Sequence, residues 1–106
     1  SEKILSGNFS LLMKNMSVNI RRILIEALKP REILLVELAQ AICSVKGAEE
    51  CDIIVTDVDV KTETIKITVK GPSIKYDDIS KILQEYGVSI KGIDEVSVAK
   101  MKQSPL

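Results

Sequence analysis

Hydrophobic and polar residues alternate along four stretches of the chain, a pattern typical of half-buried β-strands. In the first stretch, residues 19–28 (NIRRILIEAL), the side chains of Ile23, Ile25 and Ala27 fall on one face. Arginine, leucine and glutamate residues occupy the opposite face. Pro30 is expected to end this strand, because proline cannot donate a hydrogen bond to a neighbouring strand.

Residues 52–71, DIIVTDVDVKTETIKITVKG, predict the second and third strands, joined at KTET by a short hairpin loop. The pair Gly71-Pro72 is expected to end the third strand. The fourth strand is predicted at residues 93–100, with Val96 and Val98 as its core pair.

Two further stretches, residues 32–46 and 73–86, have the apolar spacing of an amphipathic helix. Gly47 and Gly87 follow them as helix stop signals. The apolar stripes consist of Leu35, Leu38, Ala39 and Ile42 in the first helix, and Ile79, Ile82, Leu83 and Tyr86 in the second.

The predicted order of elements is therefore β-α-β-β-α-β. Right-handed crossovers fold such a chain into a ferredoxin-like α+β sandwich. We expect an antiparallel sheet in the order 4-1-3-2, with both helices on one face. Residues 19–100 form this domain, preceded by an N-terminal extension (1–18) and followed by a tail (101–106).

The N-terminal extension lacks a regular pattern but is rich in large apolar side chains. Two interpretations stay open, an appended tail and an arm that docks onto a neighbouring subunit. Its apolar residues include Ile4, Leu5, Phe9, Leu11, Leu12 and Met13.

The uncovered sheet face and the two edge strands favour self-association. Leu24, Leu28, Ile53 and Val55 are expected on the uncovered face among charged residues, and mixed apolar surfaces of this kind mark interfaces. The second and fourth strands form unlike edges on opposite sides of the sheet. Their pairing would be heterologous, and repeated heterologous contacts close into a ring or grow into a filament.

Composition argues against several function classes. The 106 residues include 15 basic and 15 acidic residues, no histidine, no tryptophan and 3% aromatics, which disfavours nucleic-acid partners, His-dependent catalysis and zinc sites. The two cysteines, Cys43 and Cys51, form no CxxC, and nothing indicates a disulfide scaffold. We therefore expect the protein to be located in the reducing cytoplasm. Cys43 is expected to be a buried thiol. No apolar run approaches a membrane span, and no glycine-rich phosphate loop occurs.

One acidic pair is arranged in a way that the fold does not require. Asp57 and Asp59 lie two residues apart on the expected edge strand, and Asp94 and Glu95 begin the other edge strand. A contact between the two edges of neighbouring subunits would bring the four together. Carboxylates without Cys or His suit hard cations, Ca²⁺ or Mg²⁺. The alternative is that Asp57 and Asp59 are solvated acids paired with lysines such as Lys66.

Four stretches, RRILIEALKP, the following ELA-containing helix, VTDVDVKTETIKITVKG and GIDEV, resemble a small archaeal family, domain of unknown function number two hundred and eleven. The resemblance covers about residues 18–100, and TETIKIT and IDEV are its most specific parts. It implies a ferredoxin-like fold, a closed ring of identical subunits and bound calcium, and it supplies no catalytic residues. This chain has Glu26 where the family has Asp, and the family begins near Met16 of this sequence.

The favoured interpretation is a non-enzymatic, ring-forming cytoplasmic homo-oligomer that binds a divalent cation or a small ligand between subunits. The alternative is a regulatory ligand-sensing module of the amino-acid-binding type that partners an enzyme, which uses the same fold. Neither interpretation includes a nucleic-acid or membrane partner.

Overall fold

The computed structural model describes residues 18–100, which form six elements. The expectations for residues 1–17 and 101–106 lie outside the described residues. In chain order the elements are β1 (Val18–Pro30), α2 (Leu35–Cys43), β2 (Glu50–Val58), β3 (Thr62–Ile74), α3 (Tyr76–Glu85) and β4 (Ser89–Lys100).

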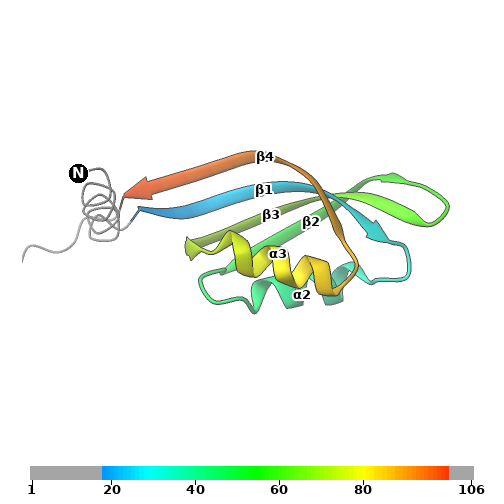
Figure 1. Cartoon of the computed structure of the whole chain (residues 1–106), viewed down its shortest axis with the longest axis horizontal. Helices are drawn as coiled ribbons and strands as arrows, with labels where there is room; N and C mark the ends of the chain where they lie inside the picture. Colours follow the sequence, from blue (N-terminus) through cyan, green and yellow to red (C-terminus); the bar gives the residue numbers. More distant parts are fainter. Residues whose placement is uncertain (1–17, 101–106) are drawn as a thin grey trace, which may run out of the picture.

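The four strands form one antiparallel sheet in the order β2-β3-β1-β4, and both helices cover the same face (Figure 1). This arrangement confirms the predicted ferredoxin-like α+β fold. The same face of the sheet that packs against α2 and α3 contains the regularly spaced apolar residues of the central strands. The opposite face, called the open face below, has no helix of residues 18–100 against it.

The core lies between the sheet and the helices, and the alternation in β1 and β3 determines which side chains enter it. Each large aliphatic side chain removed from water here contributes about 1.5–3 kcal/mol. The fully buried members are Ile23, Ile25 and Ala27 of β1, Ile65, Ile67 and Val69 of β3, Leu38 and Ile42 of α2, and Ile79 and Leu83 of α3.

The faces of β2 differ from the prediction. Ile53 and Val55, which were expected on the uncovered face, pack against the core instead. Ile54 lies on the open face opposite Lys66, with 64% of its surface exposed. Three consecutive apolar residues occupy both faces of a strand, so alternation alone could not decide which face is buried.

β3 continues past Gly71-Pro72 to Ile74, so the predicted strand end was wrong. The pairing of β2 with β3 reaches only as far as Lys70. Beyond that point β3 pairs with β1 alone, and the missing N–H of Pro72 is tolerated because proline is compatible with an edge.

Both helices are shorter than predicted, because residues 32–34 form a turn and β3 extends to Ile74. The predicted core pair of β4 was also wrong. Val96 and Val98 face the helix side, opposite Ile23 and Ile20, but each is 52% exposed. They lie where β1 and β4 run on beyond α3, so neither α2 nor α3 covers them (Figure 1).

Candidate functional site

On the open face, charged, polar and apolar side chains of the two central strands lie opposite one another in cross-strand pairs. In β1 these are Arg22, Leu24, Glu26 and Leu28, and their partners in β3 are Lys70, Thr68, Lys66 and Thr64. All eight are only partly exposed. Glu26 lies directly opposite Lys66, so their opposite charges face each other across the two strands.

Two ion pairs tie the edge strand β4 to the central strands across the open face. The ammonium of Lys66 donates a hydrogen bond to Asp94 Oδ2 at 2.7 Å, and the guanidinium of Arg22 pairs with the carboxylate of Glu95. All four side chains are between a third and a half exposed. Pairs with this exposure contribute little to stability, so their main effect is to orient the two acids.

The hydrogen bond that Lys66 donates to Asp94 raises the pKa of Lys66 above its ordinary value. The negative charge of Asp94 adds to this effect, and that of Glu26 adds a smaller part, while partial desolvation opposes it. Lys66 therefore remains a cation throughout the neutral range, and it holds Asp94 in place.

Both acids of β4 face the open side because β4 contains an irregularity at this point. Leu24 pairs with Glu95 and the next residue, Ile25, pairs with Ile93, so Asp94 is the extra residue of a bulge. Without this bulge, adjacent residues would point to opposite faces.

Asp57 follows a similar irregularity in β2. Val55 pairs with Ile65 and Asp57 pairs with Thr64, so Thr56 is the extra residue. This shift places Asp57 on the open face with Thr64. Asp57 Oδ1 accepts a hydrogen bond from the N–H of Val58 at 3.0 Å.

Asp59 lies beyond the end of β2, in the turn. The prediction that it lies on the edge strand with Asp57 was therefore wrong. Its Oδ1 accepts a hydrogen bond from the N–H of Val60 at 2.8 Å. Its own N–H donates to the carbonyl of Thr62 at 2.8 Å, which closes the hairpin.

The four predicted metal-ligating residues, Asp57, Asp59, Asp94 and Glu95, do not meet within one subunit. The first two lie at the β2 side of the sheet and the last two on β4, with β3 and β1 between them. Among residues 18–100, no group of three or more Cys, Asp or Glu residues is placed to hold a metal ion. A shared site at a subunit contact stays a prediction.

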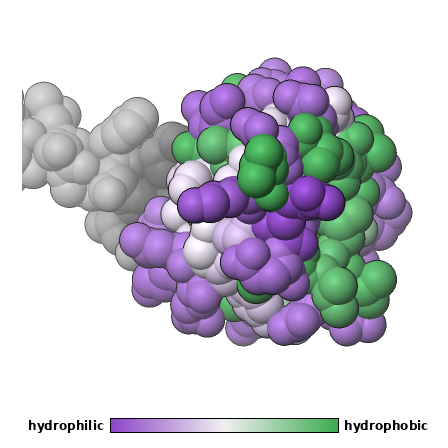
Figure 2. All heavy atoms as spheres, turned by 90° about the vertical axis from the view of Figure 1, so that its right-hand side faces the viewer, coloured by the Kyte–Doolittle hydropathy of each residue, from purple (hydrophilic) through white to green (hydrophobic). Residues whose placement is uncertain are grey.

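Exposed apolar side chains gather at the end of the molecule that bears the β2–β3 hairpin. We call Leu34, Val36, Val58 and Val60 the hairpin-end patch; Val60 is 81% exposed. The N–H of Arg31 donates to the carbonyl of Lys61 at 3.0 Å, which ties the loop before α2 to the hairpin turn. Figure 2 faces this end and shows apolar side chains along one side of it.

Lys29 is a residue whose role the sequence reasoning missed. Its side chain is 1% exposed, and its ammonium donates to the carbonyls of Pro30 and Ile33 and lies 3.0 Å from Glu63 Oε1. The signal was present, because Lys29 continues the buried phase of Ile23, Ile25 and Ala27. Its three acceptors make it a structural group that shapes the turn before α2.

Burial raises the pKa of the Cys51 thiol from 9.0 to about 12, with smaller contributions from Cys43 and Asp52. The thiol is therefore protonated and poorly nucleophilic at neutral pH. Cys43, expected to be buried, is half-buried, and both cysteines are free thiols.

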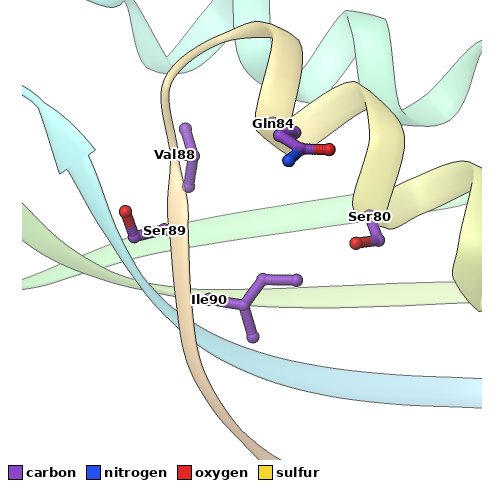
Figure 3. A pocket seen from close by; sticks show the side chains of 5 residues that line it. All are labelled: Ser80, Gln84, Val88, Ser89 and Ile90. Carbon is purple, nitrogen blue, oxygen red and sulfur yellow. The ribbon is translucent and has the colours of Figure 1, made fainter.

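Residues of the helix layer line hollows at two places in the described part of the chain. A hollow of about 280 Å³ lies between α3 and the start of β4 and is lined by Ser80, Gln84, Val88, Ser89 and Ile90, without a charged group (Figure 3). A shallower one of about 340 Å³ lies between the end of α2 and α3 and has charges of both signs. Its charged residues are Lys46, Asp78, Lys81 and Glu85.

The model of a known family, DUF211, described as uncharacterized ArCR, matches residues 21–102. The chain belongs to this archaeal family. It is also 35% identical over 81 residues to "Uncharacterized protein MJ0319" of Methanocaldococcus jannaschii, which covers 76% of this chain and 84% of that relative. Membership in DUF211 confirms the resemblance seen in the sequence. Neither description states an activity, so the functional argument rests on the geometry. Within residues 18–100 no helix has the length and apolarity needed to cross a membrane.

Proposed function

We propose that this DUF211 protein is a non-catalytic subunit that assembles head to tail, β2 of one copy against β4 of the next, into a closed ring. The observation that carries the proposal is the pair of unlike, uncovered sheet edges. β2 and β4 each have one side without a strand partner among residues 18–100. Long unpaired edges of this kind are templates for pairing with another chain.

The side chains along the two edges support the same contact. Ile54 of β2 and Ile93 of β4 are both large, apolar and substantially exposed. Pairing the edges would shield part of each side chain, Ile54 on the open face and Ile93 on the helix side opposite Ile25, and would extend one sheet through the assembly. Strands in a sheet rotate by about 20–25° relative to their neighbours, so a row of subunits joined in this way curves and can close.

The acids lie where such a contact would form. A β2–β4 contact would bring Asp57 and Asp59 of one copy towards Asp94 and Glu95 of the next, and four carboxylates repel one another. A divalent cation, Ca²⁺ in the first instance, would offset this repulsion and link the copies through oxygen ligands. Lys66 and Arg22 already neutralise two of the acids, so the cation would compete with these ion pairs.

The mass of the protein in solution tests the ring. Light scattering coupled to gel filtration should give a multiple of the 11.7 kDa chain. Ile54→Lys places a charge in the proposed contact and should yield monomers. Val36→Lys makes the same change at an equally exposed residue of α2 and should leave the assembly intact. A wild-type monomer at all concentrations would sink the proposal.

Calorimetric titration with calcium tests the cation separately. Asp57→Asn/Asp59→Asn should lower the affinity at least tenfold, and Glu32→Gln/Glu37→Gln, which removes two exposed acids on the helix side, should not. If both double variants bind calcium as the wild type does, the site assignment is wrong even if the ring persists.

The second candidate is a regulatory module that senses an amino acid and partners an enzyme. The hollow between α2 and α3 favours it, because Lys46 and Lys81 beside Asp78 and Glu85 offer both charges that a zwitterion needs. Titration with the common amino acids tests this function. Binding that Lys81→Gln abolishes would support it, and no binding by any amino acid would exclude it.

A further inference from the structure

The far end of β1 and β4 presents an apolar surface that the sheet and helices leave uncovered. We call Val18, Ile20, Val96 and Val98 the β4 strip. Ile20 pairs with Val98 and Val18 with Lys100, so all four apolar side chains point to the helix side. Val18, Val96 and Val98 are exposed, because β1 and β4 extend past the N-terminal end of α3 (Figure 1).

We propose that residues 1–17 of the same subunit pack over the β4 strip. These residues join β1 at Val18, which is itself the first residue of the strip. They contain seven large apolar side chains, and those of Phe9, Leu12 and Met13 are the ones proposed to cover the exposed valines. Burying apolar side chains on both surfaces supplies the driving force.

The tether has the right length for its own subunit. From Val18 to the level of Val96 the strip spans about four residues of strand, ~13 Å. The five residues from Met13 to Val18 reach up to roughly 17 Å when extended. Phe9 to Met13 can therefore turn back over the strip. A short tether also gives a high effective concentration, so own-subunit docking outcompetes a separate copy at ordinary protein concentrations.

This docking is independent of the proposed ring. The ring contact uses the part of β4 around Ile93 to Glu95 and the backbone edge, whereas residues 1–17, called the arm below, cover side chains nearer Lys100 on the helix side. The arm would leave the open face and its acids accessible. It would also cover the β4 strip, so that the strip could not serve as a second apolar surface for association.

Limited trypsin digestion of the full chain tests the proposal, with cleavage after Lys14 followed by mass spectrometry. Docking should slow this cleavage about tenfold relative to Val96→Asp/Val98→Asp, in which the strip carries charge. The matched control Val36→Asp/Val60→Asp makes the same change in the hairpin-end patch and should keep the slow rate. Equal rates in all three proteins would overturn the proposal.

Two further measurements keep the outcome decisive. Phe9→Asp/Leu12→Asp changes only the arm, so residues 18–100 fold as before, and it should speed cleavage as much as the strip variant does. Protection by the chain's own arm should not depend on protein concentration. Protection that grows with concentration would assign the strip to a second copy instead, and would contradict docking within one subunit.

Discussion

At the scale of single residues, Lys29 shows how a charged group can belong to a core. Its ammonium is fully removed from water and is surrounded by two carbonyl oxygens and the carboxylate of Glu63. A buried charge is tolerated only with such partners. This group also explains why the chain turns between β1 and α2 instead of starting the helix at once.

Replacing Lys29 by Met should lower the free energy of unfolding by about 3 kcal/mol, because it leaves the partly buried Glu63 without its partner. Urea unfolding followed by circular dichroism measures this change. Lys75→Met removes an exposed lysine and should cost less than about 0.5 kcal/mol. If both variants lose a similar amount of unfolding free energy, the buried ion pair between Lys29 and Glu63 does not account for the effect.

Cys51 makes stability sensitive to alkaline pH. The pKa of its thiol is about 12 in the folded protein, against 9.0 ordinarily. Between these values the unfolded chain loses the proton while the folded protein keeps it, so the free energy of unfolding falls as pH rises through this window. The raised pKa of Lys66 acts in the same direction, since its stabilising effect is lost as pH rises through that pKa.

Thermal unfolding at pH 8 and pH 10.5 isolates the contribution of Cys51, because Cys51→Ser leaves Lys66 in place. Cys51→Ser should reduce the loss of stability on going to the higher pH, and Cys43→Ser should reduce it less. The thiol of folded Cys51 should also react with iodoacetamide at pH 8 far more slowly than that of the denatured chain. Identical pH profiles for wild type and Cys51→Ser would rule this explanation out.

At the scale of elements, the loop after α2 and the strand β3 touch through two glycines. Gly47 has φ +94°, and a Cβ on Gly71 would clash with the carbonyl oxygen of Gly47. The N–H of Glu49 donates to the carbonyl of Lys70 at 2.8 Å in the same crossing. The start of β2 is therefore fixed by backbone contact, which requires small residues at both positions.

Gly71→Ala should lower the free energy of unfolding by roughly 2 kcal/mol, because the backbone must move to admit a methyl group. Gly92→Ala is the matched change within β4, where an added Cβ meets nothing within 4 Å. It should be neutral or slightly stabilising. Chemical unfolding of both variants measures the difference, and equal stabilities would contradict the close approach.

The sequence predicted the elements and their order because β1 and β3 alternate cleanly, with Ile23, Ile25 and Ile67 as examples. It failed where local pattern carries no information. Ile53 to Val55 are apolar on both faces, and the bulges at Thr56 and Asp94 arise from pairing between distant strands. Val96 and Val98 look like core residues, but their burial depends on where α3 begins. Asp57, Asp94 and Glu95 were placed on the correct strands, but Asp59 lies in the turn and not on β2. The separation of the two acidic pairs is a property of the sheet order.

At the scale of the whole molecule, head-to-tail assembly links folding to concentration. If copies associate through β2 and β4, the folded state is stabilised by mass action. The midpoint of thermal unfolding should therefore rise with protein concentration for the wild type and stay constant for Ile54→Lys. Scanning calorimetry over a hundredfold range of concentration measures this. A constant midpoint for both proteins would argue that the edges remain free.

The position of β1 in the sheet has a consequence for synthesis. β1 is made first, yet it pairs with β3 on one side and with β4, the last of the described elements, on the other. Until residues 89–100 leave the ribosome, one side of this apolar strand lacks its partner among the described strands. A nascent chain stalled before Ser89 would expose one edge of the apolar strand β1. Synthesis and pairing of the final twelve residues of the domain therefore protect the newly made chain from aggregation.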